Sequence, residues 1–188
     1  MKAVGVFATA AGIAISQACA AEIPLHSQHY SNTDYRFSVN IPTRLTACVS
    51  EGTNNGVAIS LDHETGCDKI TNNPPFATVF ANYNVATGVK TQEGLAKLNC
   101  YGPEVRRTTL LNNWTIGGRP AGGCRLYLDQ NEIEVKLMTL RKTDTQNPEA
   151  WIEIGAYLST TTARYERDMR VFRQIVRTIR IAPDGPLE

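Results

Sequence analysis

The cysteines of this 188-residue chain are the feature that most restricts its fold. There are five, and the first, Cys19, lies in an N-terminal segment that has the form of a cleavable export signal. Removal of that segment leaves Cys48, Cys67, Cys100 and Cys124. An even number of cysteines in an exported chain indicates disulfides, here two. We therefore expect a compact domain in which two bridges tie separate segments together.

Four cysteines allow three pairings, and the sequence does not choose among them. We favour Cys48–Cys67 and Cys100–Cys124, because each pair closes a loop between segments that we expect to be neighbours. Each loop has around twenty residues, so each bridge is expected to contribute about 3 kcal/mol through the entropy of the unfolded chain. A zinc site is disfavoured, since no CxxC or CxxH spacing occurs.

The export signal is predicted to occupy residues 1–20. Lys2 is followed by an apolar, uncharged run from Val4 to Ile15, and Ala18-Cys19-Ala20 supplies the small residues of a cleavage site. The run is shorter than the roughly 20 residues that a membrane-spanning helix needs. A retained anchor helix and a lipid on Cys19 are the alternatives. We expect a mature chain that begins at Ala21, lies in the bacterial periplasm or outside the cell, and has no membrane span.

The charge balance excludes some partners. The full chain has 19 lysines and arginines against 18 aspartates and glutamates, and loss of Lys2 with the signal leaves 18 of each. A chain without net charge lacks the basic surface that non-specific nucleic-acid binding requires. We therefore expect no nucleic acid among its partners.

Periodicity in the rest of the chain predicts one α+β domain over residues 35–182. Residues 21–34 are polar and without period, which predicts a mobile lead-in, and residues 183–188 are expected to form a disordered tail. Alternating or apolar segments predict strands, with Asn55-Gly56 and Gly117-Gly118 suited to turns. The predicted strands cover residues 36–41, 47–50, 57–61, 76–85, 114–117, 124–128, 133–141, 151–158 and 179–182.

Two helices are predicted in this domain. Thr91 is a suitable N-cap for a short helix that ends near Asn99. A longer helix is expected from Thr162 to about Thr178, because apolar residues recur there at spacings of three and four. These residues are Tyr165, Met169, Phe172, Ile175, Val176 and Ile179. The predicted architecture is thus an antiparallel sheet with a long C-terminal helix packed on it.

Motifs for catalysis are absent from the sequence. It contains no GxSxG, HExxH or SxxK, and Gly117-Gly118 is not followed by the residues of a phosphate loop. Asp62-His63-Glu64 is the densest polar cluster, but adjacent residues of a polar loop seldom converge on one point. His26 and His29 belong to the lead-in. We therefore predict no catalytic residues, no metal ligands and no cofactor.

The long helix carries the strongest candidate for a binding surface, a row of arginines opposite its apolar stripe. Arginine forks bind carboxylates and phosphates through two hydrogen bonds, so this face is a candidate surface for an acidic partner, most simply another protein. The alternative is a solvated helix face, in part neutralised by Glu166 and Asp168. The candidate residues are Arg164, Arg167, Arg170, Arg173 and Arg177, followed by Arg180.

Three short segments together resemble the Mog1/PsbP-like superfamily of small α/β proteins. They are residues 35–42 (YRFSVNIP), 114–121 (WTIGGRPA) and 171–179 (VFRQIVRTI). In that superfamily an opening strand ends in proline, a sheet turn carries a Gly-x-Pro-like sequence, and a late helix leads into the last strand. The resemblance implies a non-enzymatic interaction module and transfers no site residues.

The sequence hypothesis is thus an exported, non-catalytic binding protein that acts through its sheet or its arginine-bearing helix. An inhibitor or immunity protein that protects the cell from a toxic enzyme is one form of it. Two alternatives remain, a secreted hydrolase that uses His63 with a remote nucleophile and a carrier of a small ligand between helix and sheet.

Overall fold

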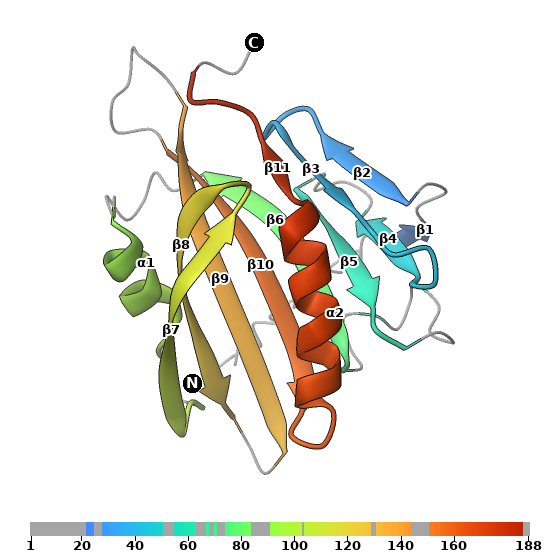
Figure 1. The fold of residues 1–188 in the computed structure, drawn as a ribbon, viewed down its shortest axis with the longest axis vertical. Helices are drawn as coiled ribbons and strands as arrows, with labels where there is room; N and C mark the ends of the chain where they lie inside the picture. The colour runs from blue at the N-terminus through green and yellow to red at the C-terminus, as the bar shows by residue number, and fades with distance from the viewer. Residues whose placement is uncertain are drawn as a thin grey trace, which may run out of the picture.

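The computed structural model describes residues 22–24, 28–50, 55–62, 67, 70, 74–83, 91–102, 104–128, 131–143 and 151–185. They form a large antiparallel sheet, a small sheet and two helices (Figure 1). The predicted α+β class is confirmed. The predicted signal with Cys19 and residues 186–188 lie outside the described residues. Within those ranges, no helix has the length and apolarity to cross a membrane.

The large sheet has eight strands, and every neighbouring pair is antiparallel. In order across the sheet they are β1 (Glu22–Pro24), β4 (Ala47–Ser50), β5 (Gly56–Ser60), β6 (Phe76–Tyr83), β10 (Trp151–Thr161), β9 (Glu132–Lys142), β8 (Arg119–Tyr127) and β7 (Arg107–Ile116). Strand β6 lies inside the sheet, between β5 and β10. It buries Phe76 on one face and Ala77, Val79 and Ala81 on the other, while Tyr83 at its end is exposed.

A small sheet lies on one face of the large one. Its strands are β2 (His29–Asn32), β3 (Phe37–Asn40) and β11 (Arg180–Ile181), in the order β11-β3-β2. Phe37 and Val39 belong to the same buried cluster as Ile154 and Leu158 of β10. The two sheets therefore share one core, and the start of the domain is joined to its end through β3 and β11.

The long helix, α2 (Tyr165–Thr178), covers the same face of the large sheet (Figure 1). It buries Met169, Phe172, Ile175 and Val176, which are members of the predicted apolar stripe. The predicted start at Thr162 is wrong, because the helix begins at Tyr165 and its N-cap, Arg164, makes no side-chain capping bond. The Thr162 hydroxyl instead donates to the carbonyl of Asn131, 3.3 Å away.

The opposite face of the large sheet carries the short helix α1 (Gln92–Asn99) and both disulfides. The Thr91 hydroxyl accepts a hydrogen bond from Gly94 N at 3.0 Å, so the predicted N-cap is confirmed. The favoured pairings Cys48–Cys67 and Cys100–Cys124 are confirmed as well. We call this side the disulfide face and the side under α2 the helix face.

One cross-strand row of residues connects the two disulfides. Antiparallel pairing places each residue on the same face as its partner in the next strand. From β4 to β8 the row reads Cys48, Ala58, Thr78, Tyr157, Lys136 and Cys124. Each end of this row is therefore linked covalently to a segment outside the sheet strands, one through Cys67 and the other through Cys100.

The turn between β7 and β8 confirms the prediction made for Gly117-Gly118. Both glycines have positive φ, 58° and 78°, as a two-residue hairpin turn of this type requires. A Cβ at Gly117 would lie 2.6 Å from Ile181 Cγ1. This close contact packs the tip of the hairpin against β11.

Four predictions of local structure need correction. Strands β1 and β2 lie in residues 21–34, where we expected a mobile lead-in, because pairing with β4 and β3 supplies order that a short polar segment lacks by itself. Strand β7 begins at Arg107 rather than Trp114, and a register shift after Leu111 hides its alternation. The third correction is the start of α2, which is Tyr165 rather than Thr162. Cys124 and Leu126 are buried on the disulfide face, in a cluster separate from that of Val135 and Leu137.

The fourth correction concerns the C-terminal tail, which we expected to be disordered from residue 183. The carbonyls of Pro183 and Gly185 accept hydrogen bonds from Arg141, at 3.1 and 3.0 Å. Order extends past the last strand because a side chain 42 residues earlier in the sequence holds the backbone there.

Candidate functional site

The five predicted arginines lie on the side of α2 that faces away from the core, but their surroundings differ. Arg167, Arg170, Arg173 and Arg177 are exposed, whereas the side chain of Arg164 retains only 26% of its accessible surface. They are therefore not one uniform charged row, and each has to be judged by its contacts.

Arg164 and Arg167 hold a buried carboxylate, that of Asp168. This side chain is 1% exposed and accepts from the Thr160 hydroxyl at 2.6 Å. Arg164 Nε and Arg167 Nε donate to its two oxygens at 3.3 and 3.2 Å. Because a buried carboxylate needs charged or hydrogen-bonding partners, these two arginines serve the fold first.

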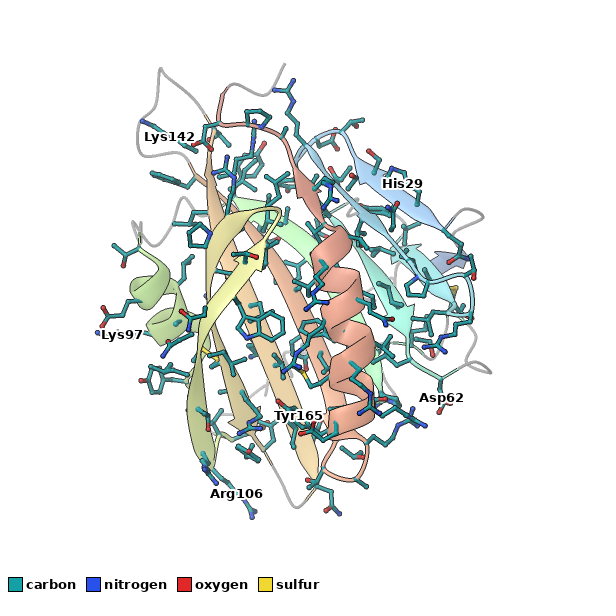
Figure 2. The ribbon with its side chains drawn as sticks, in the orientation of Figure 1. His29, Asp62, Lys97, Arg106, Lys142 and Tyr165 are labelled. Carbon is teal, nitrogen blue, oxygen red and sulfur yellow. A yellow bond between two sulfur atoms is a disulfide. The ribbon has the colours of Figure 1, made fainter. Side chains whose placement is uncertain are left out.

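Arg164 also joins α2 to the end of strand β5. Its Nη1 donates to Asp62 Oδ2 at 3.0 Å, across 102 positions of sequence. Figure 2 shows Asp62 beside the end of α2 at which Tyr165 lies. Asp62 thus has a structural partner, and it is the member of the Asp62-His63-Glu64 cluster that the structure describes.

An open groove of about 340 Å³ lies between this end of α2 and the segment that follows β3. Arg44, Arg167 and Arg170 line it together with Leu45 and Val171. We call it the arginine groove. Asp168 and Asp62 also line it, but their carboxylates are already bound by Arg164 and Arg167. Guanidinium groups around a partly apolar depression suit a carboxylate-bearing side chain of a partner.

The remaining two arginines lie farther along the helix. The Arg173 guanidinium stacks over the Trp114 ring, 5.6 Å from its centroid, and Trp114 in turn lies 6.4 Å from the Phe172 ring. This cation–π contact fixes the side chain against the β7–β8 hairpin. Arg177 is exposed, and its carbonyl accepts from Arg180 Nη1 at 3.1 Å. Arg173 is thus positioned by the fold, while Arg177 extends the positive surface.

The described histidine and acidic residues provide no set for catalysis or metal binding. His29 Nδ1 lies 2.7 Å from Asn40 Oδ1, on the exposed side of the small sheet. His26, His63 and Glu64 lie outside the described residues. In the ranges given above, no three His, Cys, Asp or Glu side chains gather as a metal site would need.

The disulfide face has a hollow of its own, of about 300 Å³, near the middle of the cross-strand row. Phe80, Met138 and Tyr157 line it together with Glu153, whose pKa burial raises above the ordinary value. The Tyr157 hydroxyl donates to Glu134 Oε1 at 2.5 Å, and its pKa is raised chiefly by burial. The polar side chains around this hollow are partly buried, and Tyr157 is hydrogen-bonded to Glu134. Such an arrangement is compatible with simple packing as well as with ligand binding.

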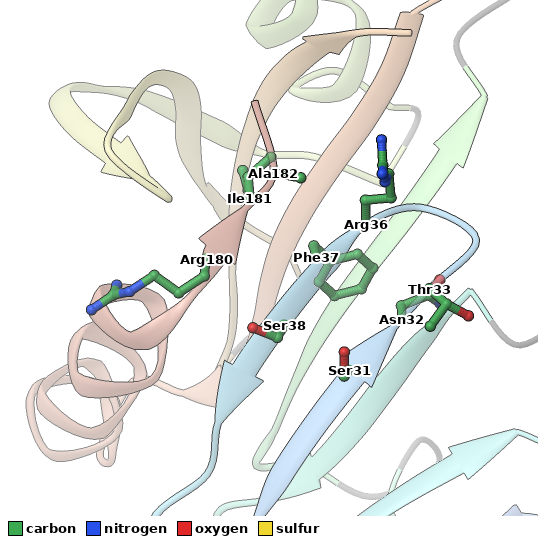
Figure 3. Close-up of a pocket in the computed structure, with 9 residues that line it drawn as sticks. All are labelled: Ser31, Asn32, Thr33, Arg36, Phe37, Ser38, Arg180, Ile181 and Ala182. Atoms are coloured by element: carbon green, nitrogen blue, oxygen red, sulfur yellow. The ribbon is translucent and has the colours of Figure 1, made fainter. Parts of the chain in front are cut away.

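Two further hollows are larger. One of about 680 Å³ lies between α1 and strands β7 and β8, with Tyr101 and Leu110 exposed beside it. The other, of about 540 Å³, lies over the small sheet beside Arg36 and Arg180 (Figure 3). The carrier hypothesis expected a pocket between helix and sheet, but α2 there covers a buried apolar core.

Sequence reasoning missed Arg44 and Arg141. Arg44 lies between strands β3 and β4, where no periodic pattern exists to connect it with α2. Arg141, which is 0% exposed, had a usable signal. It continues the alternation of Ile133, Val135 and Leu137 along the predicted strand, which places it on the core face.

Comparisons with known proteins agree with the fold and give no family. No protein-family model matches the sequence, and no curated protein matches it either. Among solved structures, the chain is similar to LpqN of Mycobacterium tuberculosis, with 12% identity and a TM-score of 0.50 over 87% of this chain and 91% of that one. It is also similar to the PsbP protein CyanoP of Synechocystis, with 13% identity and a TM-score of 0.44 over 91% and 98%.

The predicted resemblance to PsbP-like proteins is thereby confirmed as a weak likeness of fold. At such identities a shared fold does not carry a shared activity. Any statement on what this chain binds has to come from its own side chains.

Proposed function

We propose that this chain is an exported, non-catalytic binding protein of the bacterial envelope or exterior, which docks an acidic protein through the arginine groove. The observation that carries the proposal is the placement of Arg170. It lines the groove beside α2, and the acidic side chains next to it are already bound by Arg164 and Arg167. Arg170 forms no ion pair within the described residues, so its fork is available to a partner carboxylate.

Two further observations support the location and the class. The predicted export signal and the two disulfides fit an oxidising compartment outside the cytoplasm. LpqN, which shares the fold, is described as involved in cell envelope biogenesis. A protein that blocks a toxic enzyme in that compartment is the form of this function that an acid-binding surface suits best.

The test is affinity capture from the envelope fraction of the source cells, with the mature protein as bait. The test variant is Arg44→Glu/Arg170→Glu/Arg177→Glu. We expect it to lose the captured protein, and we expect wild-type capture to weaken as salt rises, because exposed charge contacts are screened.

The matched control carries the same change of charge at the opposite edge of the molecule, Lys97→Glu/Arg106→Glu/Arg107→Glu. Figure 2 shows Lys97 and Arg106 at the edge formed by α1 and β7, away from α2. The control should capture like wild type. If both variants retain the partner, the arginine groove is not the docking surface.

A further inference from the structure

Arg141, near the end of β9, is a charged side chain inside the protein. It is 0% exposed and lies on the same face of its strand as Leu137 and Val135, in the core. An arginine side chain stays protonated at every pH at which proteins are stable. Burial therefore places a full positive charge in the interior, which costs much free energy unless a partner compensates it.

The groups that contact the Arg141 guanidinium carry no charge. Its Nε donates to the carbonyls of Ala182 and Pro183, at 3.3 and 3.1 Å, and its Nη2 donates to the carbonyl of Gly185 at 3.0 Å. Its Nη1 is buried and has no hydrogen-bond partner among the described residues. A buried polar atom without a partner is rare in native structures and often marks an ion or a water.

The charged groups near Arg141 act on it in opposite directions. Burial lowers the pKa of Arg141 most, Arg36 and Arg119 lower it further, and Asp184 raises it. The Asp184 carboxylate is already shared between Arg119 Nη2 at 2.8 Å and Lys142 N at 3.2 Å. The carboxylate that acts on Arg141 thus forms its direct bonds elsewhere.

We infer that the arginines around Arg141 form a binding site for a small oxyanion, a phosphate or a carboxylate, which completes the hydrogen bonding of Arg141 Nη1. Asp184 demonstrates the chemistry, since an oxyanion is already held by Arg119 and Lys142 N there. Arg36 and Ala182 also line the hollow of about 540 Å³ over the small sheet (Figure 3), and the Ala182 carbonyl accepts a hydrogen bond from Arg141. This site lies apart from the arginine groove and goes beyond the proposed function.

The test measures thermal unfolding of the protein with inorganic phosphate, acetate or chloride at one constant ionic strength. We expect phosphate or acetate to raise the midpoint above its value in chloride, since a ligand that binds the folded state stabilises it. The same additions should shift the 15N NMR signal of the Arg141 Nε–H. A response to phosphate alone assigns the site to phosphate groups, and a response to acetate assigns it to carboxylates.

Two variants and a control test the position of the site. Arg36→Asn removes one charge from a residue with φ of 55°, a conformation that asparagine tolerates, so the turn should persist. We expect it to weaken oxyanion binding roughly tenfold. Asp184→Asn removes the competing carboxylate and should strengthen binding roughly two- to fivefold. Arg106→Asn, at the opposite edge, should leave binding unchanged.

Equal midpoints in phosphate, acetate and chloride would overturn the inference. So would equal binding by the Arg36→Asn and Arg106→Asn variants. The variant Arg44→Glu/Arg170→Glu/Arg177→Glu serves as a further control. It changes the proposed partner surface only, so it should bind the oxyanion like wild type.

Discussion

The two faces of the large sheet are covered in different ways. On the helix face, α2 and the small sheet bury one continuous cluster that includes Phe172, Ile154 and Leu158, and none of the disulfide cysteines belongs to it. On the disulfide face, two small clusters each surround one bridge, Cys100–Cys124 beside Leu126 and Cys48–Cys67 beside Phe76. On the helix face, where α2 and the small sheet cover the strands, burial of apolar surface is the main stabilising term. On the disulfide face, where the covering segments are short, disulfides add to burial.

The two faces also treat buried charge differently. Asp168, below α2, is matched by two arginines and a hydroxyl. Glu153, on the disulfide face, has a pKa that burial raises. These two carboxylates therefore differ in environment, since partners hold Asp168 directly and burial acts on Glu153.

The largest expected effect tests the continuous core of the helix face. Phe172 is 0% exposed and packs against Trp114, so Phe172→Ala should lower the free energy of unfolding by about 4 kcal/mol through lost burial and a cavity. Denaturant unfolding measures the change. A loss below about 1 kcal/mol would contradict the claim that this core carries most of the stability.

A somewhat smaller effect is expected from the disulfide face. Cys100→Ser/Cys124→Ser should cost about 3 kcal/mol, because the bridge closes a loop of 24 positions in the unfolded chain. Amide hydrogen exchange should show α1 and the start of β7 opening first while α2 stays protected. Uniform loss of protection over both faces would show that the two clusters are one cooperative unit.

The smallest effect concerns Glu153. Its pKa is higher in the folded protein than the ordinary 4.5, so its ionisation destabilises the fold once the pH exceeds the unfolded value. Glu153→Gln should therefore raise the free energy of unfolding at pH 7, by less than about 1 kcal/mol since solvent screens part of the effect. The gain should shrink as the pH falls and vanish well below the ordinary pKa of 4.5, where both states of wild type are protonated. A gain independent of pH would point to packing instead.

The sequence predicted those elements whose pattern repeats within a few residues. The apolar stripe of α2, the Thr91 N-cap and the glycine turn at 117–118 depend on neighbours along the chain, and the structure confirms all three. The strands β1 and β2 are too short to show a period, so their order comes from partners elsewhere. The strand predicted for β7 was too short, because a register shift interrupts the alternation of its residues.

The candidate site was predictable to a lesser degree. The arginines of α2 were visible as a row, but their roles depend on Asp62 and Asp168, and Asp62 is 102 positions from Arg164. A sequence shows which side chains can form ion pairs, whereas folding decides which of them do. For this reason Arg164 and Arg167 proved to be structural partners, and Arg44 joined Arg170 in the groove.

By itself, the sequence of this protein determined the α+β class and the main helix, and it favoured the disulfide pairs without deciding them. Helix and strand periods are properties of local backbone geometry, and both bridges join cysteines that are near in sequence. Tertiary structure alone decided which face of the sheet receives the cysteines, which arginines are engaged, and that Arg141 is buried under the C-terminal segment. These outcomes depend on contacts between residues that are far apart in the sequence. Such contacts form, and stabilise the protein, only when the chain has folded.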